Sequence, residues 1–201
     1  MKRNTIIFIL LIAIIIVILF YSFSGGESRE EYIARIATVR AEKDVFFKYN
    51  SESPFANHSE SFKGLNYYQP DPDYKVNARL SLSDKKEVII LGTNDSLTKA
   101  YKNYGIVEFE LGGKTNHLLI LEMYEPFDGK LFLAFADHTS TEDTYGAGRY
   151  LDVEYSGGNF ITLDFNLAYN PYCAYVEGFS CPFPPPDNLL ETPIMAGEKI
   201  Y

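Results

Sequence analysis

Two aspartates at the ends of predicted strands are the candidates for catalytic chemistry in this sequence. Asp137 directly follows the apolar run 131–136, and Asp164 lies near the end of the run 159–165. A carboxylate held in a closed pocket can act as a general base, so either residue could activate water in a hydrolase. The structural alternative for both is that a strand-end Asp caps a turn or accepts backbone N–H groups.

Arg149 and Asn166 are the candidates for binding a ligand beside these carboxylates. The Arg149 guanidinium presents five donors in a fixed fork, which suits it to clamp a carboxylate or phosphate group. Asn166 lies two positions after Asp164, so both side chains would share one face of an extended strand. Tyr145 and Tyr169 are further candidates, because a tyrosine ring can stack on a ligand. The alternatives are a buried ion pair of Arg149 with one of the aspartates, and packing of Tyr169 along the C-terminal coil.

The sequence predicts neither a metal site nor a cofactor. Its three histidines show no metal-ligand spacing with its two cysteines. The glycines of 145–148 lack the strand–turn–helix context of a phosphate-binding loop, and a Ser-His-Asp triad built on Ser140 lacks the glycines of a nucleophile elbow. Glu198 and Lys199 are expected to form a local pair or to face solvent.

Cys173 and Cys181 are the only two cysteines, and seven residues separate them. In an oxidising compartment such a pair predicts a disulfide, which would stabilise the fold by roughly 2–3 kcal/mol through closure of a short loop. If the thiols are reduced, we expect both residues to be small buried groups.

The first 26 residues have the pattern of a membrane anchor. No charged residue occurs in 4–26, and every position of 6–20 is apolar. A helix of about 18 residues is roughly 27 Å long, close to the thickness of a bilayer's hydrocarbon core. We therefore expect the chain to contact the membrane through residues 5–23. Lys2 and Arg3 should stay in the cytoplasm, which places the rest of the chain outside it.

A cleaved signal peptide is the alternative for this segment, because Ser22 and Ser24 are small residues that suit a cleavage site. The apolar run is longer than the core of an ordinary signal peptide, which favours the uncleaved anchor. In either case the predicted location is a bacterial cell membrane, crossed once, with the body outside the cytoplasm.

The charge of the body excludes one large class of partners. The chain has 18 Lys and Arg against 27 Asp and Glu, a formal net charge of −9. Without Lys2 and Arg3 the net charge falls to −11. Such a surface repels a phosphate backbone, so nucleic acid is not expected as a partner.

Periodicity divides the rest of the chain into a helix and a β-rich domain. Residues 27–50 show a partial three-four spacing and predict a short stalk helix. Residues 51–201 predict one antiparallel β domain, a barrel or sandwich, that ends in a Pro-rich coil. The expected strands are 76–82, 88–91, 106–111, 116–124, 131–136, 149–155 and 159–165. We expect hairpins across 112–114 and across 157–158.

A long set of residues in the C-terminal part resembles the signature of a known family. These residues are Asp137, Thr139 and Ser140, the runs 144–146, 148–151, 163–166 and 168–171, then Cys173, Ala174, Cys181, Pro182, Asn188 and the run 196–199. Together with 53–54, 62–65 and Tyr67, they are similar to the bacterial domain-of-unknown-function family 1684. The resemblance covers the whole exported body. It implies no activity, substrate or cofactor, and it does not include His138.

The sequence thus leads to two hypotheses on function. The first is a membrane-anchored extracytoplasmic domain that binds a small anionic or polar ligand or an envelope component, with Arg149 receiving the anionic group. The alternative is a hydrolase that uses Asp137 or Asp164 as general base with Arg149 as anion clamp. The sequence leaves open the ligand, the oligomeric state and whether the protein is an enzyme.

Overall fold

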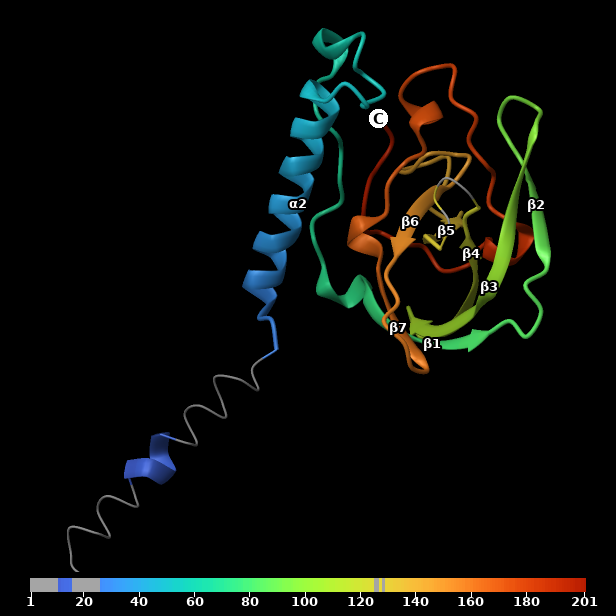
Figure 1. Ribbon diagram of the computed structural model, residues 1–201. Helices are drawn as coiled ribbons and strands as arrows, with labels where there is room; N and C mark the ends of the chain where they lie inside the picture. The colour runs from blue at the N-terminus through green and yellow to red at the C-terminus, as the bar shows by residue number, and fades with distance from the viewer. Residues whose placement is uncertain (1–10, 16–25, 125–126, 128) are drawn as a thin grey trace, which may run out of the picture.

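An antiparallel sheet, curled into a half-barrel, forms the centre of the protein (Figure 1). The computed structural model describes residues 11–15, 26–124, 127 and 129–201. Within these residues the strands are β1 (Lys75–Leu82), β2 (Val88–Gly92), β3 (Thr98–Leu111), β4 (Lys114–Glu122), β5 (Leu131–Phe135), β6 (Arg149–Val153) and β7 (Phe160–Asp164). Their order in the sheet is β6-β5-β4-β3-β1-β7. The remaining strand, β2, pairs with residues 98–102 at the start of β3. The predicted β-rich antiparallel fold is confirmed.

The hairpin of β3 and β4 follows the sequence prediction. Gly112 and Gly113 both have positive φ angles, 63° and 72°, which a two-residue hairpin turn requires. Leu111 pairs with Lys114 directly beside the turn, and the ladder continues along both strands. The glycine pair therefore fixes the register of the two longest strands of the sheet.

The predicted hairpin of the last two strands is wrong. β6 pairs with β5, for example Leu133 with Leu151, and β7 pairs with β1, for example Val76 with Leu163. The glycines at 157–158 connect the two ends of the curled sheet and do not close a ladder between neighbours. β6 and β7 approach each other without pairing, so a seam stays open between the two ends of the half-barrel.

Side chains on the two faces of the sheet form separate apolar clusters because successive residues of a strand point to opposite sides. In β5, Leu133 and Phe135 belong to the cluster inside the half-barrel, whereas Phe132 and Ala134 belong to a cluster on the outer face. The inner cluster includes Ala78, Val107, Leu118, Ile120, Leu163, Phe165 and Ile194. The outer cluster consists of Leu91, Tyr101, Leu119, Leu121, Phe132, Ala134 and Tyr150. The sheet thus needs a cover on both faces.

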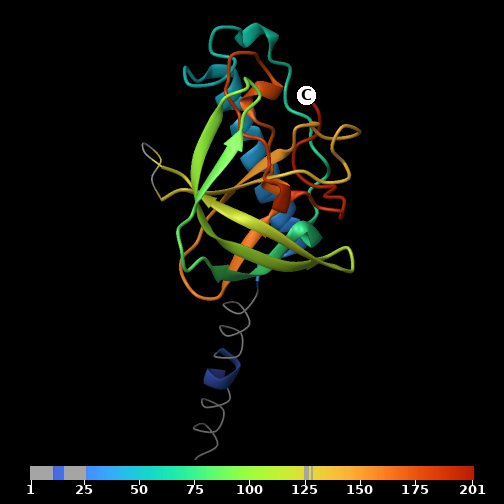
Figure 2. The same cartoon turned by 90° about the vertical axis from the view of Figure 1, so that its right-hand side faces the viewer.

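Helix α2 (Arg29–Tyr49) supplies part of that cover. It begins at a capping box, in which the Ser28 side chain accepts the backbone N–H of Glu31 and the Glu31 side chain accepts that of Ser28. Tyr32, Ile36 and Phe47 are its buried residues. The expected stalk helix therefore lies along the body, and Figure 2 shows it behind the curled sheet.

Short 3₁₀ helices connect the strands and shape the C-terminal coil. Their bounds are η1 (Ser59–Ser61), η2 (Pro72–Tyr74), η3 (Phe165–Leu167), η4 (Tyr172–Ala174) and η5 (Pro186–Asn188). Asn188, at the end of η5, is fully buried and exchanges hydrogen bonds with the backbone of Leu119 in β4. This contact fixes the Pro-rich coil against the sheet.

Most of the expected anchor, residues 1–26, lies outside the described residues. Leu11–Ile15 are described, and they are helical and exposed. In the part of the chain that the structure describes, no helix combines the length and the apolar composition needed to cross a bilayer.

Candidate functional site

Arg149 and Asp137 form an ion pair in the interior of the protein. Arg149 is the first residue of β6, and its Nη2 donates to Oδ2 of Asp137 at 2.8 Å. The two side chains are 1% and 0% exposed. The structure thus brings two predicted site residues together, in the buried pair that was the alternative to a ligand clamp.

The remaining contacts of this pair hold the segment 194–198. Arg149 Nη1 donates to the carbonyl of Ala196 at 2.5 Å, and Nη2 donates to the carbonyl of Ile194 at 2.9 Å. Asp137 accepts the backbone N–H of Ile194 at 3.1 Å. Both terminal nitrogens of the guanidinium are therefore bonded inside the protein. We call residues 194–198 the C-terminal strap.

The strap passes so close to η3 that one position in it requires glycine. Gly197 has a φ angle of 76°, and a Cβ atom there would lie 2.6 Å from the carbonyl oxygen of Phe165 and 2.7 Å from that of Ala168. Any side chain would push the strap away. This glycine explains one element of the C-terminal signature in physical terms.

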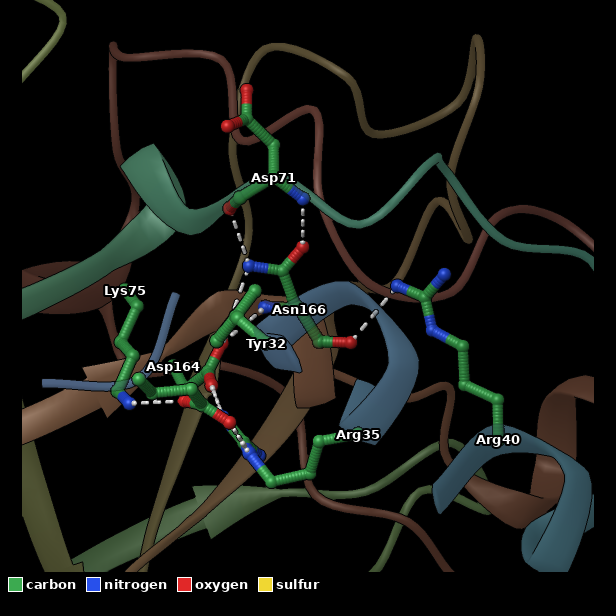
Figure 3. A network of polar contacts seen from close by, with 8 residues as sticks. Tyr32, Arg35, Arg40, Asp71, Lys75, Asp164 and Asn166 are labelled. Carbon is green, nitrogen blue, oxygen red and sulfur yellow. Dashed lines mark hydrogen bonds and ion pairs between the residues drawn. The ribbon is translucent and has the colours of Figure 1, made fainter. Parts of the chain in front are cut away.

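Asp164 and Asn166 meet where β7 ends and η3 begins (Figure 3). Asp164 Oδ1 accepts the backbone N–H and the side-chain N–H of Asn166, both at 3.2 Å. The two side chains meet because Asp164 caps η3, which turns the chain, and not because an extended strand continues. Tyr32 of α2 donates its hydroxyl to the same oxygen at 2.6 Å. Burial and this carboxylate raise the pKa of Tyr32.

Asn166 joins three segments of the chain. Its side-chain amide donates to the carbonyl of Asp71 at 2.7 Å and accepts the N–H of Asp71 at 2.8 Å. The main-chain carbonyl of Asn166 accepts a hydrogen bond from the guanidinium of Arg40 of α2 at 3.1 Å. Figure 3 shows these contacts around one fully buried amide. The pair Asp164–Asn166 thus fixes α2 and η2 to the end of β7.

Glu198 forms a third buried polar centre, which the sequence did not predict. The residue is fully buried, and its Oε2 lies 3.3 Å from Nζ of Lys43 and accepts the N–H of Asn170 at 3.0 Å. Tyr175 donates its hydroxyl to the other oxygen. The expected local pair with Lys199 is wrong, because Lys199 pairs with Asp143. The signal in the sequence was the helical spacing of Ile36, Lys43 and Phe47, which places Lys43 on the packed face of α2.

Of the two predicted tyrosines, only Tyr169 lies at a concave surface. Its hydroxyl donates to Asp152 at 2.8 Å, and Nζ of Lys43 lies 4.4 Å from the centre of its ring. Burial raises the pKa of Tyr169. Tyr145 lies elsewhere, with its hydroxyl 3.9 Å from the sulfur of Cys173.

Cys173 and Cys181 are both free thiols in the structure. They are close, since the backbone N–H of Cys173 lies 3.4 Å from the sulfur of Cys181. Burial raises the pKa of the Cys173 thiol to about 12, so little thiolate forms near neutral pH. A bond between the two sulfurs stays a prediction.

A groove of about 1570 Å³ follows the open seam between β6 and β7 and continues over the outer face of the sheet to β3. Residues of α2, among them Val39 and Phe46, form one wall. The floor is an aromatic ladder of Tyr169, Tyr150, Phe132 and Tyr101. Successive ring centres lie 6.0, 5.8 and 5.1 Å apart.

Several groups that line the groove lack partners inside the protein. Tyr101 is only 8% exposed, and among the described residues its hydroxyl has no hydrogen-bond partner. Burial raises its pKa to about 12. Large apolar side chains at the rim are exposed to solvent, namely Val39, Tyr124, Phe127, Phe160, Leu167 and Phe179. These features are typical of a binding surface.

Among the residues that the structure describes, no group of three or more His, Cys, Asp or Glu side chains could hold a metal ion. The groove residues Tyr101 and Asp152 are the site residues that sequence reasoning missed. For Asp152 a signal existed: in 149–153, Tyr150 and Asp152 alternate with Leu151 and Val153, which predicts a polar face opposite an apolar one.

Fold and groove together define an antiparallel half-barrel with a lateral groove. Comparison with known protein families identifies the family of the chain. The model of the family described as "Protein of unknown function (DUF1684)" matches residues 60–199, and the chain belongs to this family.

One solved structure is similar to most of the chain. The chain is similar to the uncharacterized protein from gene locus rrnAC0354 of Haloarcula marismortui, determined in solution by NMR. The two share 38% sequence identity with a TM-score of 0.66, over 85% of this chain and 95% of the other. No curated protein matches the chain.

Proposed function

We propose that this protein is a binding module whose ligand lies in the groove between α2 and the sheet. The observation that carries the proposal is the groove of about 1570 Å³, which has the half-buried Tyr169 in its lining and exposed apolar side chains at its rim. The packed rings of Tyr150, Phe132 and Tyr101 support its floor. Ligand sites are concave and mostly apolar, with a few polar groups that orient the ligand. The ladder and the unpartnered Tyr101 hydroxyl fit this description. The shape of the groove favours an elongated molecule with an apolar or aromatic body.

The proposal places the ligand at Tyr169 and not at Arg149. A clamp for an anion needs free guanidinium donors, and both terminal nitrogens of Arg149 are bonded to Asp137 and the strap. The geometry therefore gives little support to an anionic ligand at that residue.

The hydrolase alternative has similarly little support. Asp137 is buried in the ion pair, away from the groove lining. Asp164 does touch the groove, but its side chain is only 10% exposed and it accepts hydrogen bonds from Tyr32 and Asn166. A general base needs a free lone pair within reach of a proton.

Membrane anchoring is a second part of the proposal. The uncharged segment 4–26 and the preceding Lys2 and Arg3 support a single crossing with the body outside the cytoplasm. Protease that reaches the outer face of an intact inner membrane should digest the body, because the body would lie outside that membrane. A body that resists protease until the inner membrane is broken contradicts this orientation.

The absence of tryptophan from the chain gives a direct test of the groove. In the full chain, reconstituted in lipid nanodiscs, Val39→Trp places a single tryptophan on the groove wall. Val45→Trp is the matched control, because Val45 is exposed on the same helix and does not line the groove. The neutral probe 4-phenylbutanol should change the emission of the Val39→Trp protein saturably and leave that of the Val45→Trp protein unchanged.

A second reporter protects the test against a tryptophan that blocks the site. Ala100→Trp places the tryptophan on the wall formed by β3, at an exposed position. Equal responses at positions 39 and 45, or no response at either position 39 or position 100, contradict a binding groove.

A further inference from the structure

We infer that the ligand of the groove carries a positively charged amine at one end of an elongated apolar body. This inference rests on the proposed function, because it concerns the chemistry of the same groove. The reasons are the charges on the groove walls, the state of the lysines there, and the positions of the rings.

Acidic groups in the groove outnumber the free basic ones. Glu42 lies on α2, and Asp152 and Glu154 lie on or just after β6. Asp152 and Glu154 are two residues apart, so in the extended chain their side chains point to the same side. Among the described residues, none of these three carboxylates has an ion-pair partner.

The two lysines in the groove do not balance these charges. Nζ of Lys43 is 3.3 Å from the buried carboxylate of Glu198, and Nζ of Lys99 donates to the carbonyl of Ser180 at 2.6 Å. Lys43 is thus paired with a residue outside the groove lining. Lys99 keeps its charge, because a carbonyl carries none, so among the described residues one lysine without a carboxylate partner faces three carboxylates. A ligand that enters the groove meets a net negative wall.

Aromatic rings next to these carboxylates complete a surface suited to an ammonium group. Asp152 is hydrogen-bonded to the hydroxyl of Tyr169, the first ring of the ladder. Nζ of Lys43 lies 4.4 Å from the centre of that ring, which shows that the ring attracts a cation. The amine of the ligand would lie against the carboxylates of Asp152 and Glu154, outside the position that Lys43 occupies. Electrostatic attraction to ring faces, together with nearby carboxylates, is how proteins recognise ammonium ligands.

An independent observation at the far end of the ladder points to a ligand of defined length. Tyr101, the last ring, is more than nine-tenths buried, and its hydroxyl has no partner in the described part of the chain. None of the described residues bonds this hydroxyl, so a polar group of a ligand at that position can form a hydrogen bond with it. The amine would lie near Asp152, and the apolar body would extend along the groove past Tyr150 toward Tyr101.

Three probes of one skeleton test the charge of the ligand. The full chain in nanodiscs, with the Val39→Trp or Ala100→Trp reporter, is titrated with 4-phenylbutylamine, 4-phenylbutanol and 4-phenylbutyrate at pH 7. Titration of empty nanodiscs and of the Val45→Trp protein corrects for partition into lipid. We expect the amine to bind at least about fivefold more tightly than the alcohol, and the carboxylate to bind more weakly than both.

Neutral variants then assign the preference to the three carboxylates. The triple variant Glu42→Gln, Asp152→Asn and Glu154→Gln should reduce the preference for the amine to less than about twofold. Asparagine at 152 keeps an oxygen that can accept from Tyr169. The control triple Asp84→Asn, Glu87→Gln and Glu142→Gln changes the net charge equally at exposed positions outside the groove, and it should keep the preference.

The outcomes separate the two proposals. If all three probes bind equally, or the carboxylate binds best, the amine inference fails and the binding groove survives. If no probe changes the emission of either groove reporter, the proposed function itself fails. If the control triple loses the preference as fully as the groove triple, the attraction comes from the whole surface and the inference fails.

Discussion

The buried pair Arg149–Asp137 and the groove differ in where their polar groups are directed. In the pair, the guanidinium donors meet a carboxylate and main-chain carbonyls within the protein. In the groove, among the residues that the structure describes, the Tyr101 hydroxyl has no hydrogen-bond partner and the carboxylates of Glu42, Asp152 and Glu154 have no ion-pair partner. Residues of similar chemistry therefore have opposite roles, and the difference becomes visible only from their hydrogen bonds.

The largest effect should come from the pair itself. Arg149→Met keeps the apolar stem and leaves Asp137 buried without its counter-charge, so we expect a loss of about 3–5 kcal/mol in the free energy of unfolding. Urea unfolding followed by near-UV circular dichroism measures this change. Arg79→Met, at an exposed position of β1, is the control and should change little. A loss below about 1 kcal/mol for Arg149→Met would place this residue outside the core of the fold.

A smaller effect should come from the centre around Glu198. Glu198→Gln leaves Lys43 without its carboxylate, and burial already lowers the pKa of Lys43. Because the Lys43 side chain is partly exposed, we expect a loss of about 2–3 kcal/mol. Adding Lys43→Met should recover part of it, which a double-mutant cycle detects. Strictly additive losses would show that the two side chains do not act as a pair.

The smallest effect should come from the groove. Tyr101→Phe removes a hydroxyl that has no partner among the described residues, so at pH 7 we expect a change within about 0.5 kcal/mol. Above pH 10 the variant should differ more. The folded pKa of Tyr101 is raised to about 12, so its contribution to stability is complete below pH 10 and is lost as the pH rises from 10 to 12. The unfolding free energy of the variant should therefore fall less steeply with pH in this window than that of the parent.

The sequence predicted the elements of the fold better than their pairing. Strand alternation and the glycines at 112 and 113 were sufficient for the β3–β4 hairpin because both signals are local. The same reasoning failed at 157–158, because Leu151 of β6 pairs with a residue of β5 and Leu163 of β7 pairs with a residue of β1. The curl of the whole sheet decides that pairing, and no local pattern contains it.

The predicted site residues form buried polar contacts that hold segments of the chain together, whereas their types had suggested ligand binding and catalysis. Asp137 and Arg149 do meet, as do Asp164 and Asn166, so their clustering was foreseeable. Their burial was not, because it depends on α2 and the strap, which come from opposite ends of the body. The groove was missed since its residues belong to α2, β3, β6 and the C-terminal coil and become neighbours only in the folded chain.

The position of the strap also has a consequence for the time course of biosynthesis. Lys43 of α2 is synthesised more than 150 residues before its partner Glu198, and Arg149 is complete before Ile194 and Ala196 exist. At a synthesis rate of about 5–20 residues per second, several seconds or more pass between the synthesis of Lys43 and that of its partner Glu198. Contacts between such distant parts of a chain also slow folding. In a nascent chain the half-barrel therefore lacks the contacts of the strap until residues 194–198 have been synthesised. Chaperones that bind exposed apolar strands can act during that interval.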